Sequence, residues 1–154
     1  MKFHILLFVL AALSITACKQ DKAPDEDINY KASVPSAFGI SNLGLIASSI
    51  NKRQHTMATL YGNSVSVSRS RSNGPIAPGE KLVLVTWKQK PDEHWFGANI
   101  PADVESVEQI TTASDPQTIH YSRYMRKQHG IVRDTTGQNG RIKSIFAMQA
   151  SIMP

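Results

Sequence analysis

The segment that most constrains the fold is KLVLVTWKQ at positions 81–89, which follows a turn at Pro78-Gly79. Successive side chains of a strand point to opposite faces of a sheet. One face of this segment would carry Leu82, Leu84 and Thr86, and the other face Val83, Val85 and Trp87. Apolar side chains on both faces are typical of a central strand that is covered on both sides. We therefore expect a sheet built around this segment.

Shorter segments on either side predict further antiparallel strands joined by turns. Between 37 and 51 a strand at 44–50 fits slightly better than a helix, because Gly39 and Gly44 disfavour a helix interior. The alternation at 104–111 would leave one face of that strand in solvent. The other expected strands cover 56–61, 94–100 and 118–124, with breaks at 51–54 and at 90–92.

Two segments stay ambiguous between helix and strand. The first, 64–72, alternates like a strand, yet Asn63 would also cap a short helix there. The second, 141–153, is apolar enough to pack on the sheet in either form and follows a loop-rich stretch at 128–139. Its contact residues would be Ile142, Ile145, Phe146 and Met148. Together, the expected elements predict an α+β fold, mainly an antiparallel sheet with a few short helices.

The first 17 residues are typical of a secretory signal. Lys2 precedes an apolar run at 5–13, which is well below the roughly 20 residues that span a bilayer. The residues Ile15-Thr16-Ala17-Cys18 resemble a bacterial lipobox. We expect attachment of a diacylglycerol to the Cys18 thiol, cleavage before Cys18 and acylation of the new amine by a chain such as palmitate, which together would give a lasting membrane anchor. The alternative is an ordinary signal peptide with a coincidental cysteine.

Cys18 is the only cysteine of the chain, and this excludes several kinds of site. The mature chain could form neither an internal disulfide nor a cysteine-based zinc site. Covalent haem attachment through Cys-x-x-Cys-His is excluded as well. The sequence therefore predicts no cofactor.

The charge and the linker composition indicate where the domain would lie. The net charge is +5, or +4 without the signal and its single basic residue, and the basic residues are scattered, so nucleic acid is not an expected partner. Residues 18–36 are charged and carry two prolines, which predicts a flexible tether ahead of a domain at 37–154. Lys19 after Cys18 is typical of an outer-membrane address. The expected location is the envelope of a Gram-negative-type bacterium, lipid-anchored and facing the periplasm.

Three pieces of the sequence together resemble the cytochrome P460 family. They are TLYGN at 59–63, PGEKLVLVTWK at 78–88, and the strand pair that follows. In that family a similar strand end, a short helix and a turn into a hydrophobic strand recur in this order. The resemblance covers roughly residues 50–153 and implies an exported antiparallel-sheet protein with a helix at 64–72. The best-known activity of the family is haem-based oxidation of hydroxylamine.

The chain departs from the haem-bearing members of that family at the haem site. Those members carry Cys-x-x-Cys-His near the C-terminus, and the corresponding place here is IFAMQ at 145–149. Isoleucine and methionine stand at the cysteine positions, and glutamine stands at the histidine position. The resemblance thus implies a member without covalent haem or its proximal ligand. The lysine that crosslinks to haem in the family could correspond to Lys81.

The best local constellation for chemistry is DEHWFG at 92–97. Glu93 and His94 could bind a metal or place a general base beside aromatic side chains. The competing interpretation is the start of a strand, with Trp95 and Phe96 in the core and the charges in a turn.

A second candidate is His120, which with Tyr121 and Tyr124 could ligate a non-covalent haem. Strand residues on a sheet surface would give the same pattern. His55 and His129 lie beside basic or loop residues and are expected to be exposed.

Three functions remain open from the sequence. The favoured one is a membrane-tethered domain that binds a small ligand or a partner, in a pocket near Tyr61, Trp87, His94 and Trp95. The second is an oxidoreductase that uses non-covalent haem or a metal. The third is a structural envelope lipoprotein whose partner is another protein. Binding is favoured because the resemblance implies a retained family framework that lacks the haem-attachment motif. No serine-hydrolase, P-loop or zinc-protease motif is detected in the sequence.

Overall fold

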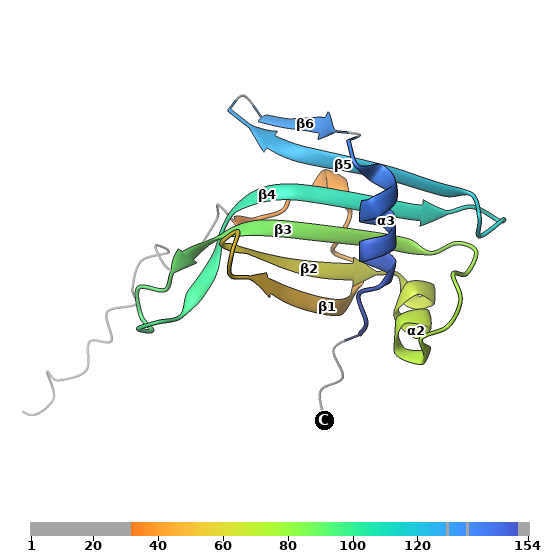
Figure 1. Cartoon of the computed structure of the whole chain (residues 1–154), viewed down its shortest axis with the longest axis horizontal. Helices are drawn as coiled ribbons and strands as arrows, with labels where there is room; N and C mark the ends of the chain where they lie inside the picture. The colour runs from red at the N-terminus through yellow and green to blue at the C-terminus, as the bar shows by residue number, and fades with distance from the viewer. Residues whose placement is uncertain (1–31, 129, 135, 151–154) are drawn as a thin grey trace, which may run out of the picture.

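The computed structural model describes residues 32–128, 130–134 and 136–150. Six strands form one antiparallel sheet in chain order (Figure 1). They are β1 (Gly44–Asn51), β2 (Thr56–Gly62), β3 (Lys81–Pro91), β4 (Asn99–Thr112), β5 (Ile119–Lys127) and β6 (Gly130–Asp134). The helices are α2 (Ser64–Ser72) and α3 (Gln138–Phe146), and a 3-10 turn, η4 (Ser36–Phe38), precedes β1. The structure confirms an α+β protein with a mainly antiparallel sheet.

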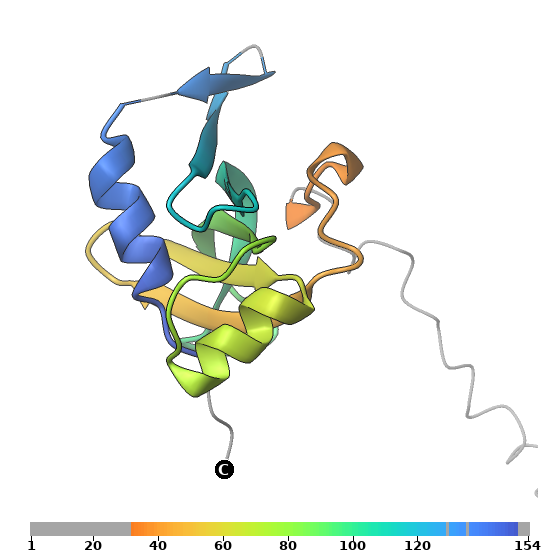
Figure 2. The same cartoon turned by 90° about the vertical axis from the view of Figure 1, so that its right-hand side faces the viewer.

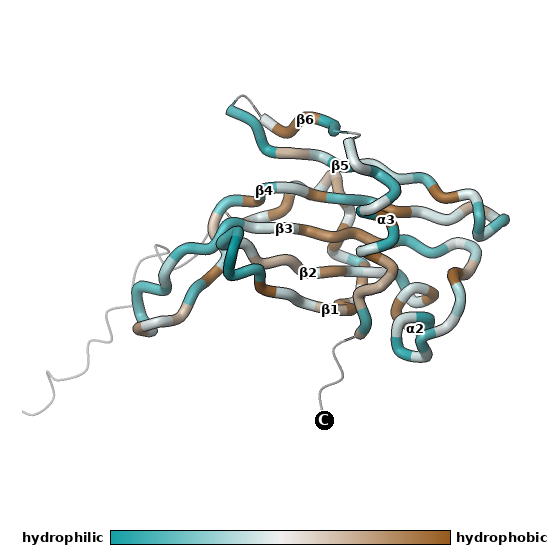
Figure 3. The backbone as a smooth tube through the Cα atoms, in the orientation of Figure 1, coloured by the Kyte–Doolittle hydropathy of each residue, from teal (hydrophilic) through white to brown (hydrophobic). Residues whose placement is uncertain are grey.

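Both faces of the sheet are covered, as the pattern of β3 predicts. Helix α3 lies across one face, and the segment 32–43 lies against the other (Figure 2). We call these the α3 face and the N-terminal face. The hydropathy of the chain follows this arrangement, since the most apolar stretch runs along the middle of β3 (Figure 3).

Each face has its own apolar cluster, and the two clusters share β3 between them. The side chains of Leu82 and Leu84 point to the α3 face, and those of Val83 and Val85 to the N-terminal face. The α3-face cluster also contains Ile46, Ala47, Leu60, Ile110, Tyr121 and Ile145, and the N-terminal-face cluster contains Phe38, Trp87, Val104 and Val107. All these side chains are buried, so β3 is the central strand that its sequence indicates.

The segment 64–72 is a helix, because its ends are capped by side chain and backbone. The Asn63 side chain accepts hydrogen bonds from the backbone N–H and the hydroxyl of Ser66, at 3.1 and 2.8 Å. Asn73 closes the other end in the left-handed conformation, with φ of 50°. These caps satisfy groups that a short helix would otherwise leave unpaired, and they outweigh the strand-like alternation of the sequence.

The structure corrects the prediction that one side of 104–111 faces solvent. Ser106, Val107 and Glu108 are all buried, although they are consecutive. The pairing of β3 with β4 is irregular around Trp87, so that Val104 and Val107 fall in the same apolar cluster. A β-bulge of this kind breaks the simple alternation at Val104. The consecutive residues 106–108 pair regularly with β3 and are buried because both faces of the sheet are covered.

The connections also differ from expectation at three places. Strand β3 extends through Pro91, and residues 93–97 form a loop instead of the extended segment predicted at 94–100. Strand β4 begins at Asn99 and continues past Pro101. The stretch 128–139, expected to be loop-rich, contributes the edge strand β6, which pairs with β5.

Part of the predicted tether belongs to the folded domain. Ala32 and Val34 pack against the N-terminal-face cluster, and the Trp87 indole N–H donates to the Ala32 carbonyl at 2.8 Å. The expectation that 18–36 stays solvated up to Ser36 is therefore wrong for these residues, because their small apolar side chains cover Trp87. The signal and lipidation site at 1–18 lie outside the described residues.

The C-terminal segment takes its helical form. Ile145 of α3 is buried on the sheet, and Ile142, Phe146 and Met148 pack around it as expected. Within the described ranges, the structure contains no helix long and apolar enough to cross a membrane.

Candidate functional site

A polar groove opens on the α3 face, beside the part of the sheet that α3 covers. Its volume is about 640 Å³. The sheet provides its floor, and α3 with the residues after it provides one wall. The lining residues are Ser49, Asn51, Gln54, Thr56, Ala58, Leu84, Thr86, Glu105, Ser106, Glu108, Arg123, Arg141, Ser144, Ile145 and Met148.

The strand register explains why the floor of the groove is polar. Ser49, Ala58, Thr86 and Ser106 stand opposite one another across β1, β2, β3 and β4, so they form one row on the same face. These side chains are small and mostly hydroxylated, and they lie next to the larger apolar side chains of the core row. The sheet therefore changes from apolar to polar along its strands, and the groove begins where this change occurs.

Glu108 is the buried charge of the groove, with 1% of its surface exposed. The Tyr121 hydroxyl donates to Glu108 Oε2 at 2.6 Å. Arg141, on α3, donates from Nε to the same oxygen at 2.9 Å and from Nη2 to Oε1. Both carboxylate oxygens are thus satisfied by charged or phenolic donors, as a buried carboxylate requires.

These contacts change the titration of both partners. Burial, followed by the hydrogen bond to Glu108, raises the pKa of Tyr121 well above its usual value, so the phenol stays protonated and donates. The hydrogen bond to Glu108 also raises the pKa of Arg141, which keeps the guanidinium charged. The phenol of Tyr121 and the guanidinium of Arg141 therefore both remain hydrogen-bond donors at physiological pH.

Arg123 lies directly opposite Glu108 on the neighbouring strand β5. Its Nη1 atom is 3.6 Å from Asp134 Oδ2, while its Nε atom is buried and has no hydrogen-bond partner within the described part of the chain. The pKa of Asp134 is lowered chiefly by hydrogen bonds from the amide and hydroxyl of Thr136, and less by Arg123. Arg123 lines the groove with a side chain that is 23% exposed and only partly paired, so its guanidinium offers a charged donor group to an acceptor there.

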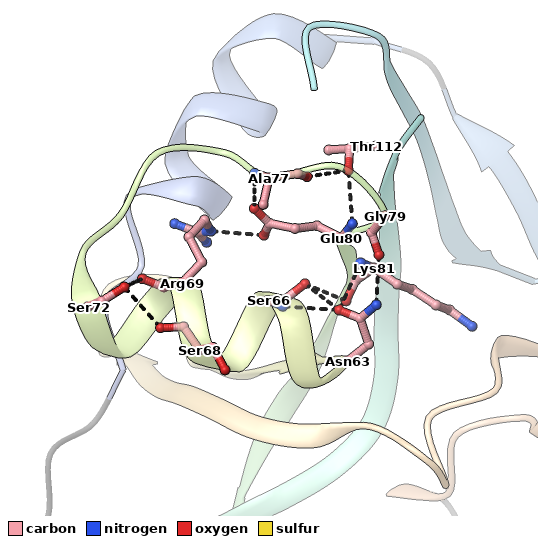
Figure 4. A network of polar contacts seen from close by, with 10 residues as sticks. All are labelled: Asn63, Ser66, Ser68, Arg69, Ser72, Ala77, Gly79, Glu80, Lys81 and Thr112. Atoms are coloured by element: carbon pink, nitrogen blue, oxygen red, sulfur yellow. Dashed lines mark hydrogen bonds and ion pairs between the residues drawn. The ribbon is translucent and has the colours of Figure 1, made fainter. Parts of the chain in front are cut away.

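A second buried ion pair lies at the α2 end of the sheet (Figure 4). Arg69 donates from Nε to Glu80 Oε2 at 2.8 Å, and both side chains are buried. Glu80 Oε1 accepts from the Ala77 amide, and the Thr112 hydroxyl donates to the Ala77 carbonyl and accepts from the Glu80 amide. All these partners hold the turn before β3 in place, so we assign the pair a structural role.

A second hollow, of about 710 Å³, lies where α3 begins beside β5. It is lined by Gln117, Ile119, Gln138, Asn139, Gly140, Ile142 and Lys143. None of these lining residues is among the buried charged groups of the residues that the structure describes. We therefore take the polar groove as the candidate site.

The residues of the predicted constellation at 92–97 do not line a pocket in the structure. Glu93, His94 and Trp95 are exposed in the loop between β3 and β4. The nearest charged partner of Glu93 is Lys90, at 3.9 Å. Trp95 and its neighbour Phe96 do not enter the core, which overturns the competing interpretation for these two aromatics.

The other residues expected near that pocket lie on the N-terminal face. Trp87 is buried beneath Ala32, and Tyr61 packs on the same cluster. The groove is on the opposite face of the sheet, so none of the four residues predicted for the pocket lines it.

His120, Tyr121 and Tyr124 do not share one face of the sheet, since Tyr121 points to the α3 face and the other two to the N-terminal face. His120 is exposed and stands opposite Thr111, whereas the adjacent Tyr121 points to the α3 face. Tyr124 packs edge-on against Phe38 on the N-terminal face, with ring centroids 5.2 Å apart. These three side chains do not converge on one site.

The remaining predicted positions have defined places. Lys81 begins β3, and its Nζ lies near Gly39 on the N-terminal face, away from the groove. Residues 145–149 complete α3 and its exit, where Ile145 and Met148 line the groove. His55 is exposed in the β1–β2 turn, and His129 and Cys18 lie outside the described residues. No group of three or more metal-binding side chains occurs in the described parts of the chain.

The residues that do line the groove were missed as a site. Glu108 shares its strand phase with Ile110, an apolar residue of the core, and this was the available signal that the carboxylate points inward. Arg141 follows Glu108 by 33 positions, so nothing local in the sequence pairs them.

No protein-family model matches the chain, and no curated protein shows significant similarity to it.

Proposed function

We propose that this protein is a small-ligand-binding domain whose polar groove on the α3 face holds the ligand. The observation that carries the proposal is the partly exposed and only partly paired guanidinium of Arg123, which lines the groove beside a floor of small hydroxylated side chains. Pockets of roughly 300–1,000 Å³ with a few placed polar groups are typical of small-molecule sites. The groove, at about 640 Å³, is in that range.

The lining indicates the chemistry of the ligand. Thr86 and Ser106 supply hydroxyls that donate or accept, and Arg123 supplies a charged donor group. Ile145 and Met148 form an apolar wall. The ligand that fits is a small polar molecule with a carboxylate, carbonyl or hydroxyl directed to Arg123 and an apolar part directed to α3.

Binding fits the groove better than proton-transfer catalysis. Glu108 is committed to Arg141 and Tyr121, so it is not a free base. The raised pKa of Tyr121 makes the phenol a persistent donor and a poor acid at neutral pH. We therefore favour a binding protein over an oxidoreductase.

We further propose that the domain is a cytochrome P460-like fold without covalent haem, tethered to the bacterial envelope through Cys18. The antiparallel sheet and the helix at 64–72 support the fold, and the lipobox-like residues 15–18 support the tether. Replacing Cys18 by serine should leave the precursor uncut or release the protein from the membrane. A Cys18→Ser protein that stays membrane-bound and normally cut would contradict the lipoprotein proposal.

The groove proposal is tested by amide chemical-shift titration of the mature chain with phenylacetate, an anionic probe with an apolar part, and with 2-phenylethanol, its neutral counterpart. We expect saturable shifts at the row formed by Ser49, Ala58, Thr86 and Ser106 for at least one probe. Thr86→Phe should abolish them, because the ring would fill the groove floor. Thr111→Phe is the matched control, since Thr111 is an exposed strand threonine on the other face.

Shifts that persist in the Thr86→Phe variant would place the binding elsewhere on the protein. Shifts that appear only around His94 or His120 would favour the sites predicted from the sequence over the groove.

A further inference from the structure

We propose that the tip of the β3–β4 hairpin docks on the lipid bilayer, with Trp95 and Phe96 inserted at the membrane interface. The inference is independent of the groove. It rests on the proposed anchor at Cys18 for one point only, which is that a bilayer lies within reach of the domain.

The tip carries the most exposed large apolar side chains of the described residues. Trp95 is 72% exposed and Phe96 is fully exposed, and the two are adjacent in sequence. Both side chains leave the sheet instead of joining either apolar cluster. Adjacent exposed aromatics of this size mark an interaction surface, whereas single exposed apolar residues are ordinary.

The backbone of the loop is held in one shape by its own hydrogen bonds. The Asp92 amide donates to the Ala98 carbonyl at 2.9 Å, and the Ala98 amide donates to the Trp95 carbonyl at 3.0 Å. The Asp92 carboxylate accepts from the His94 amide at 2.8 Å. Gly97 has φ of +80°, a conformation that favours glycine. The loop therefore presents the two aromatics without having to be ordered by its partner.

The described chain begins at the same end of the sheet as the tip. Ala32 contacts Trp87, which lies on β3 at the base of the hairpin. Only residues 19–31 separate Cys18 from Ala32, and a chain of that length reaches roughly 50 Å even when fully extended. A lipid attached at Cys18 thus keeps the hairpin end of the domain close to the bilayer.

The chemistry of the tip suits an interface between lipid and water. Tryptophan is enriched at membrane interfaces, where its ring sits at the level of the headgroups, and phenylalanine contributes apolar area below it. The β1–β2 turn, at the same end of the sheet, adds Lys52 and Arg53, both exposed (Figure 1). The backbone amide of Gln89 on β3 donates to the His55 carbonyl at 2.8 Å, and this bond connects β3 to that turn. The tip itself carries Asp92 and Glu93, and Lys90 lies 3.9 Å from Glu93. Lys52 and Arg53 are therefore the cations that would favour an anionic bilayer.

The test uses the sole cysteine of the mature chain. Unacylated mature protein is coupled through the Cys18 thiol to a maleimide lipid in phosphatidylglycerol–phosphatidylethanolamine vesicles, with or without bromine on the acyl chains. This anchor exists whether or not the cell acylates Cys18, so failure of the lipoprotein proposal does not affect the result. Trp95 reports insertion, and the Trp95→Tyr variant gives the separate emission of buried Trp87.

We expect brominated lipid to reduce the Trp95 emission by about twofold or more, because the indole would lie near the upper acyl chain. The emission of the Trp95→Tyr variant should not change. Phe96→Ser should weaken the quenching, while Leu45→Ser, an exposed leucine at the far end of β1, should leave it intact.

Two results would overturn the proposal. One is equal quenching of the wild-type and Trp95→Tyr proteins, which would show that Trp95 stays in water. The other is a blue shift of Trp95 that grows with protein density and does not depend on bromine, which would show that the tip binds a second copy of the chain.

Discussion

Glu108 on β4 and Arg141 on α3 form a bidentate ion pair that connects the helix to the sheet at the edge of the groove. The carboxylate is fully buried, whereas the guanidinium side chain is 38% exposed. The pair therefore connects the core to the surface of the site. Both residues line the groove together with Thr86 and Ser106 of the hydroxylated row.

Removing Arg141 should destabilise the protein by about 2–4 kcal/mol, because it leaves a buried carboxylate short of charged donors. This expected loss of stability is smaller than that for a fully buried ion pair, because the guanidinium is partly exposed to water. Urea unfolding of Arg141→Met measures it, with Arg53→Met, an exposed arginine, as the control. The double variant Glu108→Leu/Arg141→Met should recover much of the loss. If the double variant is as unstable as the sum of its singles, the two residues are not coupled.

Alkaline pH should destabilise the protein through Tyr121. The pKa of Tyr121 is raised in the folded state, so the folded state holds the phenolic proton more tightly than the unfolded state does. This contribution is complete below the unfolded pKa of about 10 and is lost as pH rises above it. Unfolding measured at pH 8.5 and 10.5 should show a smaller decrease for Tyr121→Phe than for the wild type. A decrease of the same size in both proteins would show that Tyr121 does not contribute to the loss of stability at alkaline pH.

Arg69 should matter far more than its neighbour Arg71 on the same helix. Arg69→Met leaves Glu80 buried without its cation, and we expect a loss of about 3–5 kcal/mol. Arg71 is exposed, so Arg71→Met should change stability by less than about 0.5 kcal/mol. Comparable losses in the two variants would mean that the pair with Glu80 does not hold α2 and the turn before β3.

Two glycine-to-alanine changes should have opposite signs. A Cβ at Gly62 would lie 2.6 Å from Ile46 Cδ1 and 2.7 Å from Ser66 Cβ, so Gly62→Ala should destabilise by about 1–3 kcal/mol. A Cβ at Gly140 meets nothing within 4 Å and lies in α3, so Gly140→Ala should stabilise by about 0.5–1 kcal/mol. Thermal unfolding of the two variants checks both signs. A stable Gly62→Ala protein would show that α2 does not pack closely on the end of β2.

The sheet could be predicted because its signal is local. The alternating apolar faces of 81–89 define β3, and this strand requires cover on both sides. Helix α2 could be assigned only with the help of Asn63 and the family resemblance, because its serine-arginine repeat has the period of a strand. The bulge opposite Trp87 could not be seen, since it depends on how two strands align.

The candidate site could not be predicted, for two physical reasons. Its charged pair joins residues far apart in the chain, and a glutamate in a half-polar strand is more often exposed. The sequence directed attention instead to 92–97, because Glu93 and His94 lie beside aromatic residues there. In the structure the local hydrogen bonds of the hairpin loop hold Trp95 outside.

The most direct test of the ligand-binding account is native mass spectrometry of the protein isolated from bacterial envelopes under mild conditions, compared with its Thr86→Phe variant. If the groove holds a ligand, we expect a bound small molecule on the wild type and on Thr111→Phe, and none on Thr86→Phe. The same bound mass on all three proteins, or none on the wild type across repeated preparations and added metabolite extract, would contradict it.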